Sequence, residues 1–272
     1  MSISTDFLDE VDEFYVFLTT LEDHYWSKNT GFKEWKVRDI VGHLHFFDRI
    51  SLLAVEDKEG FETKKKSMMS DFASGKTSEQ LVEQSFNTLD SDRLMTQWID
   101  TAQKLGEKLA KLEPKDRLPW FGPDMSVRMF TTARYMETWA HGQAIYDLTN
   151  IDRPQNDRIK SIATIGVKTF EWTFVNRKQE PPGDTPYVSL VAPSGKKWEW
   201  GEPNDSSCIS GNAFEFCQVV TQVRNILDTS MRVTGDTAQQ WMGIAQCFAG
   251  PPVDPPEKGQ RVPKKRKKHD HI

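Results

Sequence analysis

Apolar residues recur at helical spacing through most of the first 150 positions of the chain. They mark one face of a helix in each of four segments, at residues 7–21, 37–55, 94–112 and 126–149. Between the second and third of these, residues 57–77 are polar and rich in lysine, which predicts a loop or a short solvated helix. Four long amphipathic helices predict a helical bundle over residues 1–152.

The pattern changes after Pro154. A helix, two strands joined by a Pro-Ser-Gly turn and two further helices are predicted, in that order, at residues 158–176, 187–192, 196–200, 213–231 and 237–248. We therefore predict a smaller α+β domain over residues 153–250. The fold class expected for the whole chain is an α-helical bundle followed by an α+β domain.

The last 22 positions differ from both predicted domains. Residues 251–272 contain five prolines and the basic run 264–268, a composition that buries little apolar area. We expect a disordered tail. Its basic run either keeps the tail solvated or binds an acidic partner, a nucleic acid or a membrane surface, and the solvated tail is the simpler interpretation.

Composition narrows the classes of function. The 272 residues have a net charge of −5 despite the basic tail, so the predicted domains are acidic, which argues against specific nucleic-acid binding. No apolar stretch reaches the roughly 18 residues of a membrane-spanning helix, and the acidic start of the chain differs from a signal peptide. Three unpaired cysteines favour a reducing compartment, so we expect a cytoplasmic protein.

Three polar residues occupy positions that the helical pattern reserves for apolar ones. His43 lies within the apolar stripe of the second predicted helix, and Glu137 lies within that of the fourth, with His141 one turn later. A carboxylate that faces a bundle interior is costly unless a cation or hydrogen-bond donors compensate it. A positive partner for Glu137 is therefore expected.

Metal binding is one way to provide that partner. Glu137 and His141 project from the same helix face, and His43 can supply a third ligand from a facing helix. Two imidazoles and a carboxylate suit Zn²⁺, and also Ni²⁺, Fe²⁺ or Mn²⁺. The alternative is a hydrogen bond between Glu137 and His141 with an unrelated histidine in the core at position 43, and periodicity alone does not separate the two.

Two segments of the chain resemble a known family. The segment that contains Trp35, Asp39, His43 and Asp48, followed about ninety residues later by TARYMETWAHGQAIYD, resembles the DinB-like superfamily and, within it, the mycothiol-dependent maleylpyruvate isomerase family. The resemblance covers residues 5–150. The sequences VTQVRN, VTGDTAQQW and AQCFAGPP in the second half resemble a sterol-carrier-like α+β domain. One departure is Lys36, where family members usually have a Ser or Thr that caps the second helix.

The resemblance implies a site and an activity. It implies that His43, Glu137 and His141 bind a divalent metal, most simply Zn²⁺, and that a low-molecular-weight thiol such as mycothiol or glutathione attacks a small electrophilic substrate in S-transfer or cis–trans isomerisation. The partners expected are that thiol and that substrate, and whether the chain forms a homodimer stays open. Two alternatives also stay open: a metal-dependent hydrolase that needs no thiol, and a non-catalytic protein in which the metal is structural.

Other residues are candidates for supporting roles. Arg224, set among apolar residues, is a candidate for binding a substrate carboxylate, with a structural ion pair as the alternative. Arg134, one turn before Glu137, is a candidate for its hydrogen-bond partner, with a surface salt bridge as the alternative. The side chains of Trp35, Trp120 and Trp139 are candidates for the pocket wall, although such aromatic residues are more often plain core.

Overall fold

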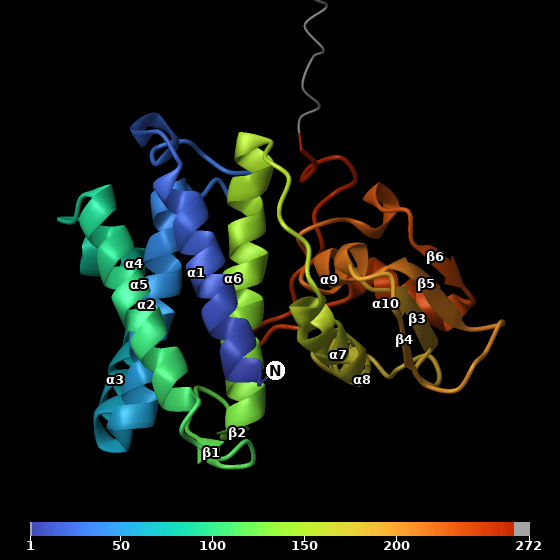
Figure 1. Cartoon of the computed structure of the whole chain (residues 1–272). Helices are drawn as coiled ribbons and strands as arrows, with labels where there is room; N and C mark the ends of the chain where they lie inside the picture. Colours follow the sequence, from blue (N-terminus) through green and yellow to red (C-terminus); the bar gives the residue numbers. More distant parts are fainter. Residues whose placement is uncertain (1, 264–272) are drawn as a thin grey trace, which may run out of the picture. The chain divides into compact units, whose positions relative to one another are not determined.

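A computed structural model of the chain describes residues 2–263, and these divide into two compact units, Met1–Gly142 and Gln143–Ile272. The helices of the first unit are α1 (Ile3–Thr19), α2 (Val37–Glu56), α3 (Lys58–Ala73), α4 (Ser78–Phe86), α5 (Ser91–Leu109) and the first part of α6 (Val127–Thr149) (Figure 1). This unit also has the 3₁₀ turn η1 (Asp23–Tyr25) and a two-residue ladder of β1 (Arg117–Leu118) with β2 (Met125–Ser126).

The four long helices of the first unit enclose its core. Helix α5 packs against α1 and α2, and α3 and α4 lie against α2. The close approach of α1 to α5 depends on Gly106, because a Cβ at that position would come within 2.5 Å of the Leu8 side chain. The largest fully buried side chains include Phe7, Phe14 and Trp98. The predicted helical bundle is confirmed, and the polar segment after α2 forms a full 16-residue helix, α3.

The second unit is a small sheet with helices. After the last turns of α6 come η2 (Asp157–Ile159), α7 (Lys160–Lys168), α8 (Phe170–Val175), β3 (Tyr187–Val191), β4 (Lys197–Trp200), β5 (Cys208–Asn212), α9 (Ala213–Val220), η3 (Ile226–Asp228), β6 (Arg232–Thr234) and α10 (Asp236–Ile244). The sheet order is β4-β3-β5-β6, with β3 and β5 parallel and both outer pairs antiparallel. The predicted hairpin is present, with Leu190 opposite Trp198.

All three predicted helices of the second unit are shorter than their apolar pattern suggests. The last of them, expected over 237–248, ends at Ile244. The segment 158–176 breaks at Thr169, where the backbone has φ of −98° and ψ of 14°, outside the regular helical values, and α7 ends. The helix expected over 213–231 ends at Val220, because Gln222 has a left-handed backbone with φ of 55°. Apolar residues at helical spacing continue past that turn, so periodicity overestimates the helix.

The structure differs from the predicted tail over residues 251–263. The carbonyl of Val253 accepts a hydrogen bond from Gln222 at 2.7 Å, that of Pro256 accepts one from Asn225 at 2.8 Å, and Asp254 pairs with Arg177. These contacts are made by backbone carbonyls and charges, which a composition argument based on apolar burial overlooks. The predicted basic run 264–268 lies outside the described residues.

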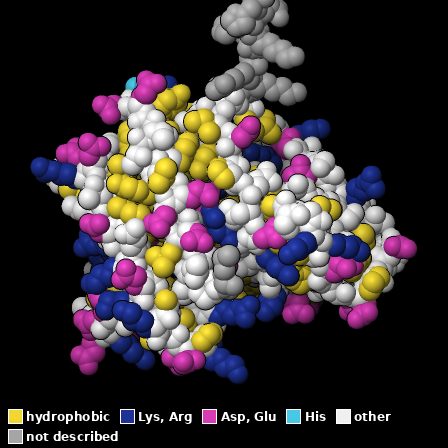
Figure 2. All heavy atoms as spheres, in the orientation of Figure 1, with side chains coloured by type: hydrophobic (Ala, Val, Ile, Leu, Met, Phe, Trp, Pro, Cys, Tyr) yellow, Lys and Arg dark blue, Asp and Glu magenta, His cyan; other side chains and the backbone are white. Residues whose placement is uncertain are grey.

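Two further results concern the charges on the surface and the apolar character of the helices. Lys/Arg and Asp/Glu side chains are interspersed over the face shown in Figure 2. No helix in residues 2–263 combines the length and apolar character needed to cross a membrane.

Candidate metal centre

Three side chains from two helices converge inside the first unit. His43 on α2 and Glu137 and His141 on α6 each offer one ligating atom, and the three atoms lie within 4.8 Å of one another. Oε2 of Glu137 is 3.1 Å from Nε2 of His141 and 3.5 Å from Nε2 of His43. The i, i+4 spacing on α6 places its two ligands on one face, as the sequence predicts. We call these three residues the triad.

The triad is only partly covered. The exposed fraction of the side chain is 13% for each histidine and 25% for Glu137. Burial, and then the neighbouring His141, lower the pKa of His43 to about 4, so its ring is neutral at pH 7. Burial alone would raise the pKa of Glu137, but the hydrogen bonds with His141 and His43 outweigh it and hold that pKa well below its usual value. The triad therefore combines a carboxylate with the lone pair of a neutral imidazole.

Aromatic rings surround the two histidines. Trp35 lies nearly parallel to His141, with ring centroids 5.7 Å apart, and its centroid is 5.1 Å from that of His43. Phe32 meets His141 edge-on at 5.0 Å, and Phe47 contacts His43 at 4.8 Å. These contacts fix the rotation of both imidazoles and keep water from part of the triad. Trp35 therefore lies beside the triad and also lines the pocket described below, and its role as a wall stays a prediction.

The loop that carries Phe32 and Trp35 is tightly folded. The N–H of Thr30 donates to the Trp35 carbonyl at 2.7 Å, and the N–H of Trp35 donates to the Phe32 carbonyl at 2.8 Å. Lys33 and Glu34, between the two aromatic residues, both have positive φ, at 49° and 59°. Two consecutive non-glycine residues in that region are uncommon and strained. The loop thus holds its aromatic side chains in a defined position beside the triad.

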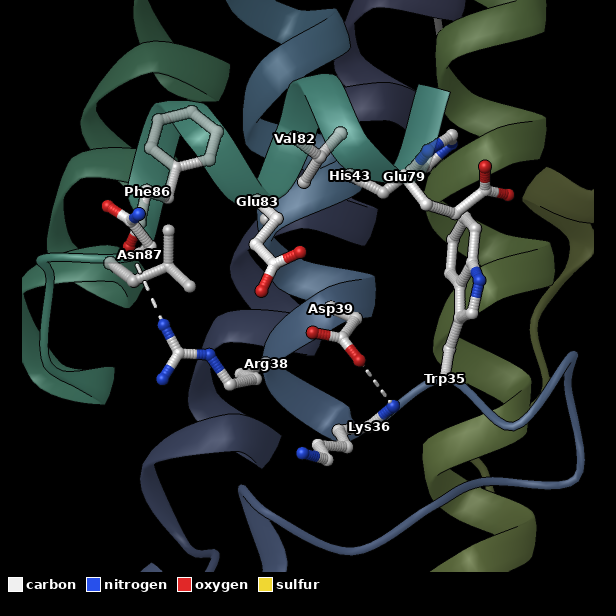
Figure 3. A pocket seen from close by; sticks show the side chains of 12 residues that line it. Trp35, Lys36, Arg38, Asp39, His43, Glu79, Val82, Glu83, Phe86 and Asn87 are labelled. Atoms are coloured by element: carbon white, nitrogen blue, oxygen red, sulfur yellow. Dashed lines mark hydrogen bonds between the residues drawn. The ribbon is translucent and has the colours of Figure 1, made fainter. Parts of the chain in front are cut away.

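A pocket of about 390 Å³ opens beside His43. Its lining comes from the loop at Trp35, the first turns of α2, helix α4 and the start of α5. Figure 3 places His43, Glu79 and Trp35 toward one end and Arg38 and Asn87 toward the other. The volume is in the range of small-molecule sites. A ligand in this pocket can therefore approach His43 directly.

Helix α2 begins where the pocket begins, at Lys36. A lysine side chain cannot accept a hydrogen bond, so it cannot cap the helix as Ser or Thr does. The Lys36 N–H donates to the Asp39 carboxylate at 2.9 Å instead, which is half of a capping box. Arg38 adds long hydrogen bonds to the carbonyls of Phe86 and Leu89 and so ties α4 to α2. The unusual residue at position 36 leaves the helix start intact.

The structure gives Arg134 a different partner from the expected one. Its Nε donates to Oδ1 of Asp48 at 2.9 Å, and both side chains are buried. The other Asp48 oxygen accepts from Nε1 of Trp98 at 3.1 Å. Asp48 belongs to the segment with Trp35, Asp39 and His43 that resembles the DinB-like superfamily, but no role was predicted for it from the sequence. Its position in the apolar pattern of α2, five residues after His43, was the signal available in the sequence.

The remaining candidates lie elsewhere. Trp120 packs against Phe61, Phe121 and Phe130, and Phe130 is about 10 Å along α6 from Glu137 at the usual rise per residue. Trp139 is only 1% exposed and lies two residues after Glu137, on another side of α6. The position of Trp139 agrees with the alternative interpretation of plain core, whereas Trp120 is half-buried within its aromatic cluster.

Arg224 lies in the second unit and has an acidic partner there. Its guanidinium donates to both carboxylate oxygens of Asp147, at 2.7 and 2.8 Å, and also to the Arg261 carbonyl. Only 7% of the Arg224 side chain is exposed. This is the structural ion pair that the sequence left open as the alternative to carboxylate binding.

Comparisons with known proteins give consistent results. Residues 7–146 match the family model described as the mycothiol maleylpyruvate isomerase N-terminal domain. Two uncharacterized proteins of Mycobacterium tuberculosis, from strains CDC 1551 / Oshkosh and ATCC 25618 / H37Rv, are each 35% identical to this chain over 91% of its length and 95% of their own.

Solved structures share the fold. The crystal structure of a mycothiol-dependent maleylpyruvate isomerase aligns with a TM-score of 0.52 and 10% identity over 80% of this chain and 86% of that one. A mutant of that enzyme aligns over the same shares with a TM-score of 0.50 and 11% identity. At such low identity the likeness shows the fold alone.

Proposed function

Because the chain belongs to the family of the mycothiol maleylpyruvate isomerase N-terminal domain, we propose that it is a metal-dependent enzyme in which a low-molecular-weight thiol attacks a small electrophilic substrate. The observation that carries the proposal is the convergence of the three ligating atoms of His43, Glu137 and His141 within 4.8 Å. The reaction is S-transfer or cis–trans isomerisation. Both begin with the same bond between sulfur and carbon.

The donor set fits a divalent ion. One carboxylate oxygen of Glu137 faces the Nε2 atoms of both histidines. Each Nε2 can donate its N–H to that oxygen or, in the other tautomer, direct its lone pair to a cation that the oxygen also binds. Nδ1 of His43 is buried and finds no hydrogen-bond partner among residues 2–263, so the ring is directed through Nε2 alone. Two nitrogens and one oxygen suit Zn²⁺ first, and also Ni²⁺, Fe²⁺ or Mn²⁺.

The surroundings suit catalysis rather than a closed structural centre. A divalent ion held by three protein groups keeps positions open, and its charge lowers the pKa of a thiol or water that reaches it. Trp35 and Phe32 cover His141 and limit the approach of water, while the pocket gives a substrate a route to His43. Phe47 and Trp35 hold the His43 ring between them.

The proposed chemistry balances without a redox partner. The thiol loses its proton, and its sulfur forms a bond to an electrophilic carbon of the substrate. In an isomerisation the carbon–carbon π bond opens, the resulting single bond rotates, and the carbon–sulfur bond then breaks to restore the double bond and release the thiol. In a transfer by addition, the π electrons take up the proton that the thiol released, so the neighbouring carbon becomes C–H and the thioether is the product.

A thiol-dependence assay tests this proposal. The purified protein is incubated with maleylpyruvate, the substrate named for the solved structures, and with mycothiol, glutathione or no thiol, and the cis–trans conversion is followed. We expect conversion only with a thiol, and a loss of at least about 100-fold in His43→Ala, because a ligand is removed. His45→Asn, two residues away on the same helix and outside the triad, is the matched control.

The alternatives give different outcomes. Release of a hydrolysis product without any thiol would contradict the thiol mechanism and favour the metal-dependent hydrolase. Stoichiometric metal with no turnover of a panel of thiols and electrophiles would favour the binding protein.

A further inference from the structure

A buried ion pair lies close to the triad in the same pair of helices. Asp48 on α2 is fully buried, and the side chain of Arg134 on α6 is 5% exposed. Nε of Arg134 donates to Oδ1 of Asp48 at 2.9 Å, and Trp98 on α5 donates to Oδ2 at 3.1 Å. Asp48 therefore connects three helices of the first unit through its two oxygens.

Stability alone does not explain such a pair. Removing two charges from water costs more than most ion pairs return, and buried pairs replaced by well-packed apolar residues often leave a protein equally or more stable. The best-attested benefit of a buried polar contact is that it fixes the register of neighbouring helices. The geometry of α2 and α6 indicates that benefit here.

The triad and the ion pair are two layers of contact between the same helices. On α2 the ion pair follows His43 by five residues, whereas on α6 it precedes Glu137 by three and His141 by seven, so the two helices run antiparallel. At a rise of about 1.5 Å per residue, the layers are about 7.5 Å apart on α2 and between about 4.5 and 10.5 Å apart on α6. The spacings agree, so both layers form in one register.

The two layers also fix rotation. At about 100° per residue, His43 and Asp48 point about 140° apart around the axis of α2. Rotation of that helix about its axis would therefore break at least one of the two contacts. A slip of α6 by one helical turn moves its side chains by about 5.4 Å. That shift is larger than the 4.8 Å that spans the three ligating atoms.

We propose that Asp48 and Arg134 are positioning residues, which hold α6 on α2 in the one register that brings His43 to Glu137 and His141. The inference rests on the proposed function, because it assigns the pair a role in building the metal centre. It predicts that the pair can be removed without loss of folding but not without loss of the metal site.

Cobalt binding tests the inference. A triple variant, Asp48→Leu with Arg134→Met and Trp98→Phe, replaces the polar cluster by apolar groups and leaves no buried donor without a partner. Co²⁺ affinity is measured by competition with a chelator, the Co²⁺ absorption spectrum reports the coordination geometry, and guanidinium unfolding of the metal-free protein reports stability. We expect stability equal to or above that of the wild type, affinity weaker by about tenfold or more and an altered spectrum.

Two controls separate positioning from a general effect of mutation. Trp98→Phe alone keeps the ion pair and should bind Co²⁺ as the wild type does. Asp147→Leu with Arg224→Met removes a second buried ion pair of the same chemistry, which lies in the other unit, and should leave the affinity and the spectrum unchanged. A triple variant that is folded and binds Co²⁺ within about twofold of the wild type, with the same spectrum, would overturn the inference.

A metal-independent readout separates this inference from the proposed function. If the wild type binds no Co²⁺, the proposed function fails. The register of α2 against α6 is then measured by cross-linking: His43 and His141 are both replaced by Cys, and the protein is treated with the short cross-linker dibromobimane. The linked peptides should form readily when the ion pair is present and slowly in the triple-variant background. Equal rates in the two backgrounds would overturn the inference whatever the outcome for the metal.

Discussion

A buried polar cluster of the first unit and one of the second differ in how fully their groups are satisfied. In the second unit, Arg224 and Asp147 meet through two hydrogen bonds, and the Arg261 carbonyl accepts a further one from Arg224. In the first unit, one oxygen of Glu137 serves two histidines, and Nδ1 of His43 has no partner within residues 2–263. One carboxylate is held by a guanidinium, and the other by two imidazoles.

The difference shows how a structural ion pair can be told from a ligand site. Buried charges that meet their opposites with good geometry need nothing from outside. Buried donors and acceptors that share one partner are costly unless a ligand completes them. The pocket lies beside the incomplete cluster at His43. This contrast supports the proposed binding role of the triad, whereas Arg224 and Asp147 form a structural ion pair.

The largest effect is expected from Glu137→Gln. The substitution keeps the shape of the side chain and removes the only negative charge of the triad, so the affinity for Zn²⁺ should fall by about 100-fold or more. Competition with a chromogenic chelator measures it. Asp147→Asn, a change of the same kind on the same helix, should leave Zn²⁺ affinity unaltered. Equal affinities for the wild type and Glu137→Gln would remove the carboxylate from the site.

Arg224→Met should affect stability instead of metal binding. It removes both guanidinium hydrogen bonds from the Asp147 carboxylate, whose side chain is only 13% exposed, and leaves the amide of Gln143 as a donor. The free energy of unfolding of the second unit should therefore fall by about 3 kcal/mol. Urea unfolding followed by circular dichroism measures the change, and metal content is determined on the same sample. Loss of metal with unchanged stability would reverse the roles assigned to the two clusters.

Trp35→Ala should give a smaller effect, on the rate of metal release. The indole covers His141 and contacts His43, so its removal lets water and chelator reach the triad, and release to a chelator should become about tenfold faster. Trp35→Phe, which keeps an aromatic ring, should stay close to the wild type. If all three proteins release metal at one rate, the aromatic wall does not control access.

The smallest effect concerns the closed interior of the second unit. Burial raises the pKa of the Cys217 thiol well above its usual value, so at pH 8 the fraction of reactive thiolate falls below that of a free cysteine. Cys247 is also buried, whereas Cys208 is half-buried. Labelling with a chromogenic disulfide should therefore modify Cys208 first, as peptide mass analysis would show. Early labelling of Cys217 would show that this interior opens.

Much of the fold could be predicted from periodicity, because a long helix with one apolar face produces a regular pattern of apolar residues in the sequence. The bundle and the hairpin were predicted in this way, as was the placement of Glu137 and His141 on one face of α6. The breaks at Thr169 and Gln222 were not, because an irregular backbone at the first and a left-handed backbone at the second end helices whose apolar pattern continues. The periodicity of apolar residues indicates which face of a helix is buried. It does not indicate where the backbone conformation ends that helix.

The partners of charged residues were harder to predict than their positions. The sequence placed Arg134 one turn from Glu137, but the arginine reaches across to Asp48, since the nearest residue along a helix is not always the nearest in space. Arg224 likewise pairs with Asp147, 77 residues away. Pairing of this kind depends on the packing of whole elements, which a single sequence does not specify.

X-ray absorption spectroscopy of the purified protein tests the central claim most directly. The account predicts one equivalent of a divalent transition metal per chain, with a spectrum that shows two imidazole ligands and a carboxylate oxygen. In His43→Ala the spectrum should show one imidazole ligand fewer, or the metal should be lost. A wild-type protein without stoichiometric metal, or a metal whose ligands are unchanged in that variant, would contradict it.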